Sequence, residues 1–361
     1  MSDYYLGTMC GTSLDAFDVS ILKTSKANFK VIGFKSYKID DDLRKKLRNQ
    51  ITKKRVNLKL DDEVSKYVSR CVNKILTSYK INKKNIRAIG YCGITLNHNP
   101  AKKKSLYIGN PDLIRELTDI NVVANFRQSD INFGGQGAPL TGYFQHYLSN
   151  LHKKKLAFLN LGGFANIMIW NKNQAISYDT GPANYLIDAW CRTKFKRTFD
   201  KSGKLAQKGE INNEFLKSMM KDHYFLAKPP KSTGFERFNL DWIMKHKRKV
   251  RGIKNIDVLA TLTYLTISTV SIELSKSTTN NSQLYIYGGG VKNTTVTEGI
   301  LNQINMGRLK KIGNGIDEKN FESACFAWLA LKRLNRKVFT KSNITGRKKM
   351  VRLEMFFKLF F

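Results

Sequence analysis

The chain has 361 residues, 42% of them hydrophobic, and its 63 Lys and Arg residues against 28 Asp and Glu residues leave a formal net charge of +35. Such a chain is globular and long enough to form about two domains. Its five cysteines show no CxxC pair and no zinc-ligand spacing, which excludes a disulfide framework and a metal finger and indicates reduced thiols.

The positive charge raises the question of a nucleic-acid partner. Lysines are spread through nearly every segment, and no basic block alternates with aromatic residues as in RNA-binding motifs. The chain is rich in Asn and Ile and poor in Ala and Pro, which indicates a coding bias towards AT-rich codons. We therefore expect dispersed lysines without a nucleic-acid partner, with a polyanion-binding face as the alternative. Residues 1–6 lack the basic start and apolar core of an export signal, so we expect a cytoplasmic protein.

The first predicted element is a β-hairpin over residues 7–22, GTMCGTSLDAFDVSIL. Gly7 and Gly11 permit the backbone angles of a tight turn, and Thr and Ser hydroxyls lie beside its N–H groups. Such a turn can hold phosphate, and Asp15 or Asp18 could hold a hydrated Mg²⁺ that bridges phosphate oxygens. An ordinary hairpin with a polar loop is the alternative.

The following segments predict alternating helices and strands. Residues 40–83 are highly charged with apolar residues at helical spacing, which predicts two helices. Residues 86–96 and 120–126 are strand-like. The glycine-rich segment 130–148, DINFGGQGAPLTGYFQHYL, leads into an amphipathic helix and marks a candidate domain boundary.

The second half begins the pattern again. Residues 155–171, KLAFLNLGGFANIMIWN, predict two strands around a Gly162–Gly163 turn, as in the opening hairpin. The apolar run Val258–Leu274 is interrupted by Ser and Thr residues and ends in an acid, so it predicts a buried helix rather than a membrane span. A strand then enters a third glycine turn within LYIYGGGVKN, and a helix over residues 321–334 closes the domain.

Three glycine turns at strand ends suit a nucleotide clamped between two α/β lobes, because glycine lets the backbone approach phosphates and purine closely. The sequence contains neither GxxxxGK[ST] nor GxGxxG. The commonest P-loop and dinucleotide signatures are therefore excluded, although nucleotide binding is not.

The chain resembles a known family, anhydro-N-acetylmuramic acid kinase. The resemblance extends from about residue 7 to 334 and is carried, in the family's order, by GTMCGTSLDAFD, NFGGQGAPL, LNLGGFANI, YDTGPANYLIDAW, KPPKSTGFERFN, DVLATLT, YIYGGGVKN and GIDEKNFESACFAWLA. It implies an α/β protein with a two-lobed actin-like ATPase (ribonuclease H-like) fold and a nucleotide cleft between the lobes. The first lobe would comprise residues 1–127 and about 329–361, and the second residues 128–328.

The resemblance also implies a reaction in peptidoglycan recycling. Water would open the 1,6-anhydro ring of anhydro-N-acetylmuramic acid while O6 takes the γ-phosphate of ATP, giving N-acetylmuramic acid 6-phosphate and ADP. ATP and Mg²⁺ would be the cofactors, and the protein could form a homodimer. Two alternative functions are a general sugar or hexosamine kinase of the same superfamily, and a catalytically weakened paralogue that binds polyanions.

Site residues follow from the matching positions. Asp179 would be the catalytic base, and the alternative is that it only stabilises the turn in which it lies. Glu322 would be a second acid of the site, and the alternative is that it only interacts with the dipole at the start of its helix. Arg127, Asp130 and Gln136 would bind the sugar, and a surface ion pair is the alternative for Arg127. Asp15 would hold Mg²⁺ through water. The nucleotide would be bound by Gly11, Thr12, Ser13, Leu14, Asp15, Ala16, Phe17, Asp18, Gly162, Gly163, Gly288, Gly289 and Asn293.

The sequence departs from the family pattern at several positions. Cys92 and Ile94 stand where the family has His and Gln, Asn125 where it has Asp, and Ala183 where it has Gly. These departures concern the expected sugar site more than the fold. After Gly346 the family's ending is lost, so the tail 347–361 is either divergent or frame-shifted.

Overall fold

The structure, a computed structural model, describes residues 3–11, 13–25, 28–53, 55–277, 282–335, 338–339, 343–346, 351–352 and 358–360. The chain divides into two compact units: unit 1 is Met1–Phe144 with Ile312–Phe361, and unit 2 is Gln145–Lys311. These bounds differ from the expected 127/128 and 328/329. Helix α4 (Phe126–Asn132) and the whole of helix α12 (Phe321–Leu334) belong to unit 1, because α12 packs on that unit's sheet.

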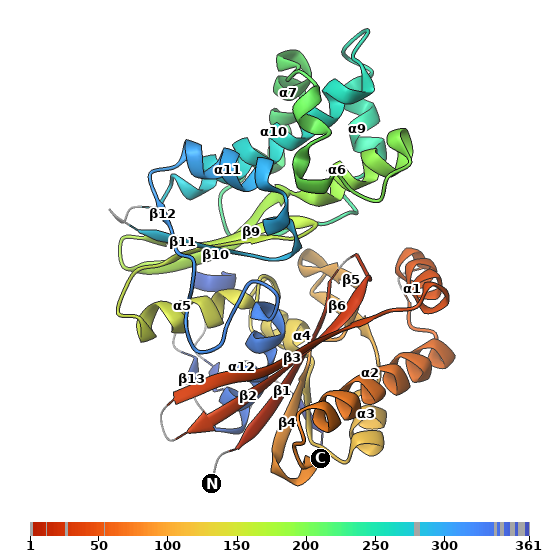
Figure 1. The fold of residues 1–361 in the computed structure, drawn as a ribbon, viewed down its shortest axis with the longest axis vertical. Coiled ribbons are helices and arrows are strands. Elements are labelled where there is room, and N and C mark those ends of the chain that lie inside the picture. The colour runs from red at the N-terminus through yellow and green to blue at the C-terminus, as the bar shows by residue number, and fades with distance from the viewer. Residues whose placement is uncertain are drawn as a thin grey trace. The chain divides into compact units, whose positions relative to one another are not determined.

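Unit 1 contains a six-stranded sheet with the order β15-β7-β4-β1-β2-β3, of which Figure 1 labels β1 to β4. Its strands are β1 (Tyr4–Cys10), β2 (Ala16–Ser25), β3 (Asn28–Lys38), β4 (Ile86–Tyr91), β7 (Val122–Ala124) and β15 (Lys358–Phe360). Strands β1 to β3 form an antiparallel meander, whereas β1, β4 and β7 are parallel neighbours. The predicted opening hairpin is therefore confirmed as β1–β2. Within the tail, β15 pairs antiparallel with β7.

Gly7 has a different role from the one expected. It lies within β1 rather than in the turn, and a Cβ there would lie 2.0 Å from the carbonyl oxygen of Ser323. Gly90 on β4 meets α12 in the same way, at 2.1 Å from the carbonyl oxygen of Phe326. Two adjacent strands thus use glycine to let α12 pack directly against the sheet.

Further elements of unit 1 surround this sheet. They are α1 (Asp41–Lys53), α2 (Leu58–Ser78), β5 (Ile94–Asn99), β6 (Lys104–Ile108), α3 (Pro111–Thr118), β13 (Val338–Phe339) and β14 (Val351–Arg352). The two helices expected over residues 40–83 are confirmed as α1 and α2. The single strand expected over 86–96 is instead two, because Gly93 turns the chain with a φ of 75° and β5 pairs with β6 in a separate hairpin.

Unit 2 repeats the topology of unit 1. Its sheet has the order β10-β9-β8-β11-β12, formed by β8 (Ala157–Leu161), β9 (Phe164–Asn171), β10 (Gln174–Pro182), β11 (Gln283–Tyr287) and β12 (Gly307–Arg308). As in unit 1, an antiparallel meander is followed by two parallel strands on the far side of the first strand (Figure 1). The repeat indicated by the two glycine hairpins is thus confirmed, and with it the α/β class of two ribonuclease H-like units of the actin-like fold.

Helix α10 (Asn255–Leu274) forms the centre of unit 2. It packs against β9, β10 and several helices, and most of its residues are buried, as predicted for this segment. Among the described residues, α10 is the one helix that is long and apolar enough to suit a membrane span. In its most apolar stretch of 18 residues, 67% is buried inside the protein. The other helices are α5 (Thr141–Leu151, across the unit boundary), α6 (Asn184–Trp190), α7 (Asn213–Met220), α8 (His223–Leu226), α9 (Leu240–Lys247) and α11 (Thr294–Gln303).

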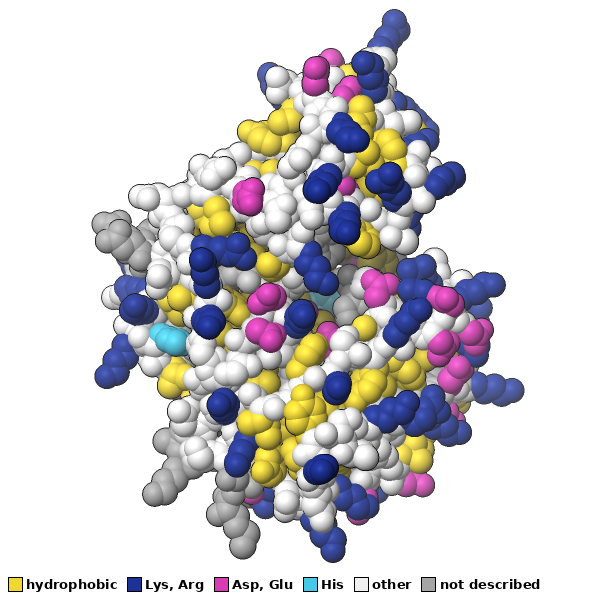
Figure 2. Space-filling model, viewed as in Figure 1, with side chains coloured by type: hydrophobic (Ala, Val, Ile, Leu, Met, Phe, Trp, Pro, Cys, Tyr) yellow, Lys and Arg dark blue, Asp and Glu magenta, His cyan; other side chains and the backbone are white. Residues whose placement is uncertain are grey.

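Basic side chains do not gather into one patch on the face seen in Figure 2. Lys and Arg residues are scattered there, with acidic and hydrophobic side chains between them. This distribution on the visible face agrees with the dispersed lysines expected from composition.

Candidate active site

The sheet of unit 2 presents a row of polar side chains. Asp179 on β10 lies directly opposite Asn166 on β9, and Asn166 lies opposite Asn160 on β8. Directly paired residues share one face of a sheet, so the three side chains form a row across the meander. The pairing register shifts just after Asp179, an irregularity that re-aims side chains and is frequent near active sites.

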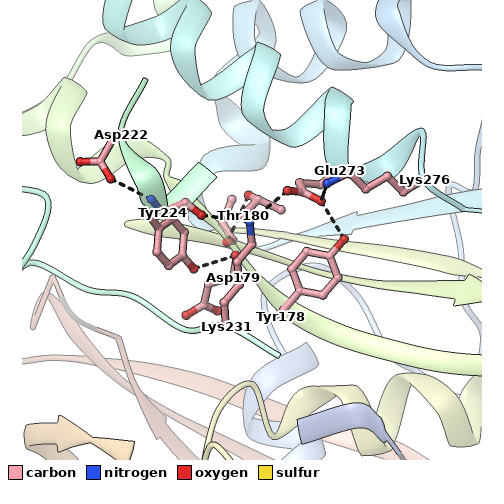
Figure 3. A network of polar contacts seen from close by, with 9 residues as sticks. Tyr178, Asp179, Thr180, Asp222, Tyr224, Lys231, Glu273 and Lys276 are labelled. Atoms are coloured by element: carbon pink, nitrogen blue, oxygen red, sulfur yellow. Dashed lines mark hydrogen bonds and ion pairs between the residues drawn. The ribbon is translucent and has the colours of Figure 1, made fainter. Parts of the chain in front are cut away.

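Asp179 is held at three atoms by segments distant in sequence. Its Oδ2 accepts a hydrogen bond of 2.9 Å from the N–H of Thr233, and its own N–H donates to the carbonyl of Lys231 at 3.2 Å. The hydroxyl of Tyr224 donates to its carbonyl at 2.8 Å (Figure 3). Asp179 as a whole is only 8% exposed to solvent. A buried carboxylate held in one orientation by an N–H donor suits a general base better than a solvated turn residue.

A buried ion pair is formed by Lys231, whose carbonyl accepts the N–H of Asp179. The Nζ atom of Lys231 is 3.0 Å from Oε1 of Glu273 on α10, and both side chains are almost fully buried. Oε2 of Glu273 accepts hydrogen bonds from Tyr178 at 2.9 Å and Lys276 at 2.5 Å. Burial by itself raises the pKa of Glu273, but the hydrogen bonds and charges of Lys276 and Lys231 prevail and lower it. Glu273 is therefore ionised at neutral pH.

Two of the predicted glycine turns come together in unit 2. Gly288 has a φ of 92°, and a Cβ there would lie 2.3 Å from Oδ1 of Asn160, two residues before Gly162 of the other turn. Both turns follow the carboxyl ends of the adjacent parallel strands β8 and β11, the edge at which ligands bind in open α/β sheets. The N–H groups of Ala183 and Tyr185 donate to the carbonyl of Gly163 at 2.9 and 3.0 Å, which fixes the first of these turns.

The third turn also contacts a segment that the sequence analysis did not single out. Asn293 caps α11 through its Oδ1, and a Cβ on Gly203 would lie 2.6 Å from that atom. The carbonyl of Ser202 accepts a hydrogen bond of 2.9 Å from Thr295 on α11. The DKSGK segment at 200–204 thus borders the expected purine end, and its Asp and Gly within a polar run were the available signal.

In unit 1 the opening turn exposes some predicted residues and buries others. Gly11, Ser13 and Asp15 are exposed. Leu14, at a φ of 57°, and Phe17 have side chains in the core, so only their backbones can face a ligand. Ala16 is half-buried at the start of β2, and Thr12 lies outside the described residues.

The two carboxylates of this turn differ in their surroundings. Asp15 pairs with Arg44 at 3.1 Å and has a side chain 65% exposed. One carboxylate oxygen of Asp18, Oδ1, is buried without a hydrogen-bond partner among the described residues, and burial raises the pKa of Asp18 although Ser36 opposes it. Where the structure is described, no group of three or more His, Cys, Asp or Glu residues is placed so that it could hold a metal ion. A Mg²⁺ held by one carboxylate, water and phosphates fits these residues.

Of the predicted sugar-binding residues, Arg127 and Asp130 lie on α4 and contact the glycine-rich loop that follows it, in which Gln136 lies. Asp130 is fully buried, and its Oδ2 accepts a hydrogen bond of 2.7 Å from the N–H of Gly137. Its Oδ1 accepts hydrogen bonds from the hydroxyls of Tyr143 and Thr345, each at 2.9 Å. The carboxylate of Asp130 therefore holds the glycine-rich loop in place through these hydrogen bonds.

Arg127 and Gln136 frame the same loop. Arg127 donates to the carbonyl of Gly137 at 3.1 Å, whereas its Nε is buried without a hydrogen-bond partner among the described residues. The backbone N–H of Gln136 donates to the carbonyl of Thr345 at 2.9 Å. A buried guanidinium N–H without an acceptor favours a ligand-binding role over a surface ion pair.

Glu322, in the first turn of α12, acts electrostatically on Cys92, as Arg127 does. Burial raises the pKa of Cys92 to about 12, with Arg127 opposing the shift and Glu322 adding to it. Cys92 is therefore a neutral, buried thiol, and Ile94 beside it is buried as well. Of the other departures, Asn125 adopts the left-handed conformation at a φ of 62°, which Asn tolerates, and Ala183 has a negative φ of −115°.

A separate pocket of about 590 Å³ lies on the helical part of unit 2. It is lined by Glu214, Lys217, Ser218, Lys221, Asp222, His223, Lys245, His246, Lys249 and Val250. None of the predicted site residues lines it.

The polar row and its supports were largely missed by sequence reasoning. Asn160, Asn166, Tyr224, Lys231 and Thr233 were not singled out. The available signal was polar residues within otherwise apolar strands, as in LNLGGFANI, and a lysine in KPPKSTG that follows two prolines.

Comparison with known proteins gives one consistent family. A family model described as anhydro-N-acetylmuramic acid kinase matches residues 3–358, and so extends into the tail beyond the segments of the sequence resemblance. The anhydro-N-acetylmuramic acid kinase of Sulfurovum sp. (strain NBC37-1) is 37% identical over 351 residues, covering 95% of each chain. That of Pseudomonas savastanoi pv. phaseolicola (strain 1448A / Race 6) is 33% identical and covers 96% of this chain and 97% of the relative.

Among solved structures, the activator of the 2-hydroxyisocaproyl-CoA dehydratase from Clostridium difficile with bound ADPNP is similar over 94% of this chain and 99% of that chain. Its identity is 11% and its TM-score 0.45, which is too distant to carry an argument about function.

Proposed function

Because the chain belongs to the anhydro-N-acetylmuramic acid kinase family and is thus a phosphotransferase of amino-sugar metabolism, we propose that it couples two bond changes in its substrate. Water opens the 1,6-anhydro ring of anhydro-N-acetylmuramic acid, and the released O6 takes the γ-phosphate of ATP. The products are N-acetylmuramic acid 6-phosphate and ADP, as peptidoglycan recycling requires. The observation that carries this proposal is the buried Asp179 carboxylate, oriented by the N–H of Thr233.

Asp179 is the proposed general base. It accepts a proton from water as the water oxygen bonds to C1 and the bond from C1 to O6 breaks. O6 leaves with the electron pair of that bond and attacks the γ-phosphorus, and the bond from that phosphorus to the β-phosphate oxygen breaks. A carboxylate suits this role because it can accept a proton from water and release it to solvent after turnover.

The glycine turns are the proposed phosphate and purine contacts. Backbone N–H groups near Gly11 in unit 1 and Gly162 in unit 2 can donate to phosphate oxygens, as glycine-rich turns do. Gly289 is open to a purine, since a Cβ there would have no neighbour within 4 Å. Mg²⁺, when bound with ATP, neutralises phosphate charge, and Asp15 or Asp18 would be the carboxylate that holds it through water.

On the sugar side we propose distinct roles for the residues of the glycine-rich loop. Arg127 binds the lactyl carboxylate, because its guanidinium retains a buried N–H to donate. Asp130 positions the loop and Gln136 contacts the sugar's polar groups, while Glu322 supports the site from the start of α12. The use of ATP and the five free thiols support a cytoplasmic location.

The test is mass spectrometry of the product formed from ATP, Mg²⁺ and the anhydro sugar in ¹⁸O-labelled water. Ring hydrolysis predicts one labelled oxygen at C1 and a phosphate on O6 in the same molecule. A phosphorylated sugar without label would support a general sugar kinase instead. Salt-dependent nucleic-acid binding without turnover would support the polyanion-binding alternative.

A further inference from the structure

We propose that Lys231 is a positioning residue for Asp179, and that its buried pairing with Glu273 ties the catalytic carboxylate to helix α10. This inference rests on the proposed function, because it takes Asp179 as the base. It concerns the loop Pro229–Thr233, which contacts Asp179 at both its backbone and its side chain.

The loop has two connections to Asp179 and one to the core. The carbonyl of Lys231 accepts from the N–H of Asp179, and the N–H of Thr233 donates to Oδ2 of Asp179. The side chain of Lys231 extends to Glu273 at 3.0 Å. Lys231 therefore joins the main chain beside the carboxylate to a fixed point on α10 (Figure 3).

A second connection passes through Tyr224. Nζ of Lys231 donates to the carbonyl of Tyr224 at 3.3 Å and lies 5.1 Å from the centre of its ring. The hydroxyl of Tyr224 in turn donates to the carbonyl of Asp179 at 2.8 Å. Loss of the ammonium would therefore loosen both the loop and α8, which meet Asp179 from different directions.

The sheet makes Glu273 a suitable anchor. Tyr178 and Asp179 are successive residues of β10, so their side chains point to opposite faces. Tyr178 donates to Glu273 at 2.9 Å on the face that packs against α10. Glu273 thus holds β10 through Tyr178 and the loop through Lys231, and fixes their relative position at Asp179.

Packing alone does not call for an ion pair here. A buried salt bridge contributes little net stability, because desolvation of both charges offsets their attraction, and apolar residues of similar volume often serve as well. An ammonium differs from such a replacement by its directed hydrogen bonds. Those bonds are what a positioning role requires.

The chain offers a matched control. Lys276, two residues beyond the end of α10, donates to the same Glu273 carboxylate, but its side chain is 50% exposed and it lies only three residues from Glu273 along the chain. Lys231→Met and Lys276→Met thus each remove one ammonium from Glu273, and only the first removes a link to Asp179. We expect Lys231→Met to lower kcat about 10–100-fold with the KM for ATP nearly unchanged, because small misplacements of catalytic groups cost about that much. Lys276→Met is expected to keep kcat within about twofold.

Two further variants separate positioning from folding. Lys231→Met with Glu273→Gln removes both buried charges, so melting temperature should recover relative to Glu273→Gln alone, while kcat should stay low. Lys231→Met combined with Asp179→Asn should be no slower than Asp179→Asn alone, because a residue that acts through another shows non-additive effects.

The outcomes separate this inference from the proposed function. If the wild-type enzyme transfers phosphate without incorporating ¹⁸O, the proposed function and this inference fall together. If the wild type incorporates label and Lys231→Met has normal kcat, the inference alone falls. It also falls if kcat recovers together with stability in the double charge-removal variant, or if the effects of Lys231→Met and Asp179→Asn multiply.

Discussion

The backbone N–H of Thr233 donates a 2.9 Å hydrogen bond to Oδ2 of Asp179 from 54 residues further along the chain. A loop that is distant in sequence therefore helps to orient the carboxylate. This hydrogen bond helps to fix the orientation of the Asp179 carboxylate relative to the rest of the site.

Replacing Asp179 with Asn should retain the fold and ATP binding and lower turnover by about 10²–10⁴-fold, the usual loss when a general base is removed. The amide keeps the volume of the carboxylate and can still accept the hydrogen bond from Thr233. Steady-state kinetics with the anhydro sugar, together with calorimetry of ATP binding, would measure both effects. Near-normal turnover would move the base role elsewhere, with Glu322 as the first residue to test.

Replacing Arg127 with Gln should raise the KM for the sugar by roughly 10–100-fold, the range expected when a hydrogen bond to a charged group of about 1.5–3 kcal/mol is lost. The KM for ATP should change little. The exposed Arg248, changed to Gln, is the control and should leave both constants unchanged. With the lactyl carboxylate of the sugar esterified, wild type and Arg127→Gln should become equal, and a persistent difference would exclude the carboxylate as the partner of Arg127.

Gly288 and Gly289 should respond differently to alanine. At Gly288 the φ of 92° and a Cβ 2.3 Å from Asn160 predict strain, so Gly288→Ala should lower the melting temperature. At Gly289 a Cβ would have no neighbour within 4 Å, so Gly289→Ala should melt as wild type does and weaken ATP binding if the purine packs there. Thermal melts with and without ATP give both quantities. Unchanged ATP affinity in Gly289→Ala would remove Gly289 from the nucleotide site.

His98 should make the protein less stable in acid. Burial, followed by the charge of Arg127, lowers the pKa of His98 from 6.5 to about 3, although a hydrogen bond to the backbone of Gln136 opposes the shift. Between these pH values the unfolded chain takes up a proton that the folded chain does not. The free energy of unfolding should therefore fall by up to about 1.4 kcal/mol per pH unit as pH decreases from 6.5.

Urea unfolding at pH 7 and pH 5 would measure this loss, and His98→Gln should show a smaller one. The comparison isolates His98, because burial also lowers the pKa of His146 and His246 and their contributions remain in both proteins. Parallel pH dependences in wild type and variant would show that His98 is protonated in the folded state.

Binding of duplex DNA should be weak and should fall steeply with salt. If the charge of +35 is dispersed, contacts are nonspecific, and affinity should drop by roughly 10³-fold or more between about 50 and 200 mM salt. ATP affinity should change far less over that range, because enclosed N–H groups and Mg²⁺ are poorly screened. Fluorescence anisotropy with labelled duplex and a labelled ATP analogue tests both. DNA binding that persists at physiological salt and competes with ATP would favour a repurposed binding protein.

Local patterns were enough to predict the repeated hairpins. The alternation around the Gly162–Gly163 turn and its copy at the start of the chain depend on neighbouring residues, and neighbours in sequence are neighbours in a hairpin. The burial of α10 was predictable for the same reason, since apolar length and composition are local properties. Asp179 was found by its family motif, and the structure adds the partners that hold it.

Only the tertiary structure decided which residues support that site. Gly7 looked like a turn residue, yet its lack of a side chain serves contact with α12, more than 300 residues later in the chain. Likewise, nothing local to KPPKSTG indicates that Lys231 meets Glu273, 42 residues away. Sequence patterns report the preferences of short segments, whereas a buried charge and a close backbone approach depend on what long-range folding brings opposite them. The sequence by itself therefore determined the repeated sheets and the family, and packing between distant segments decided how the carboxylate of Asp179 is held.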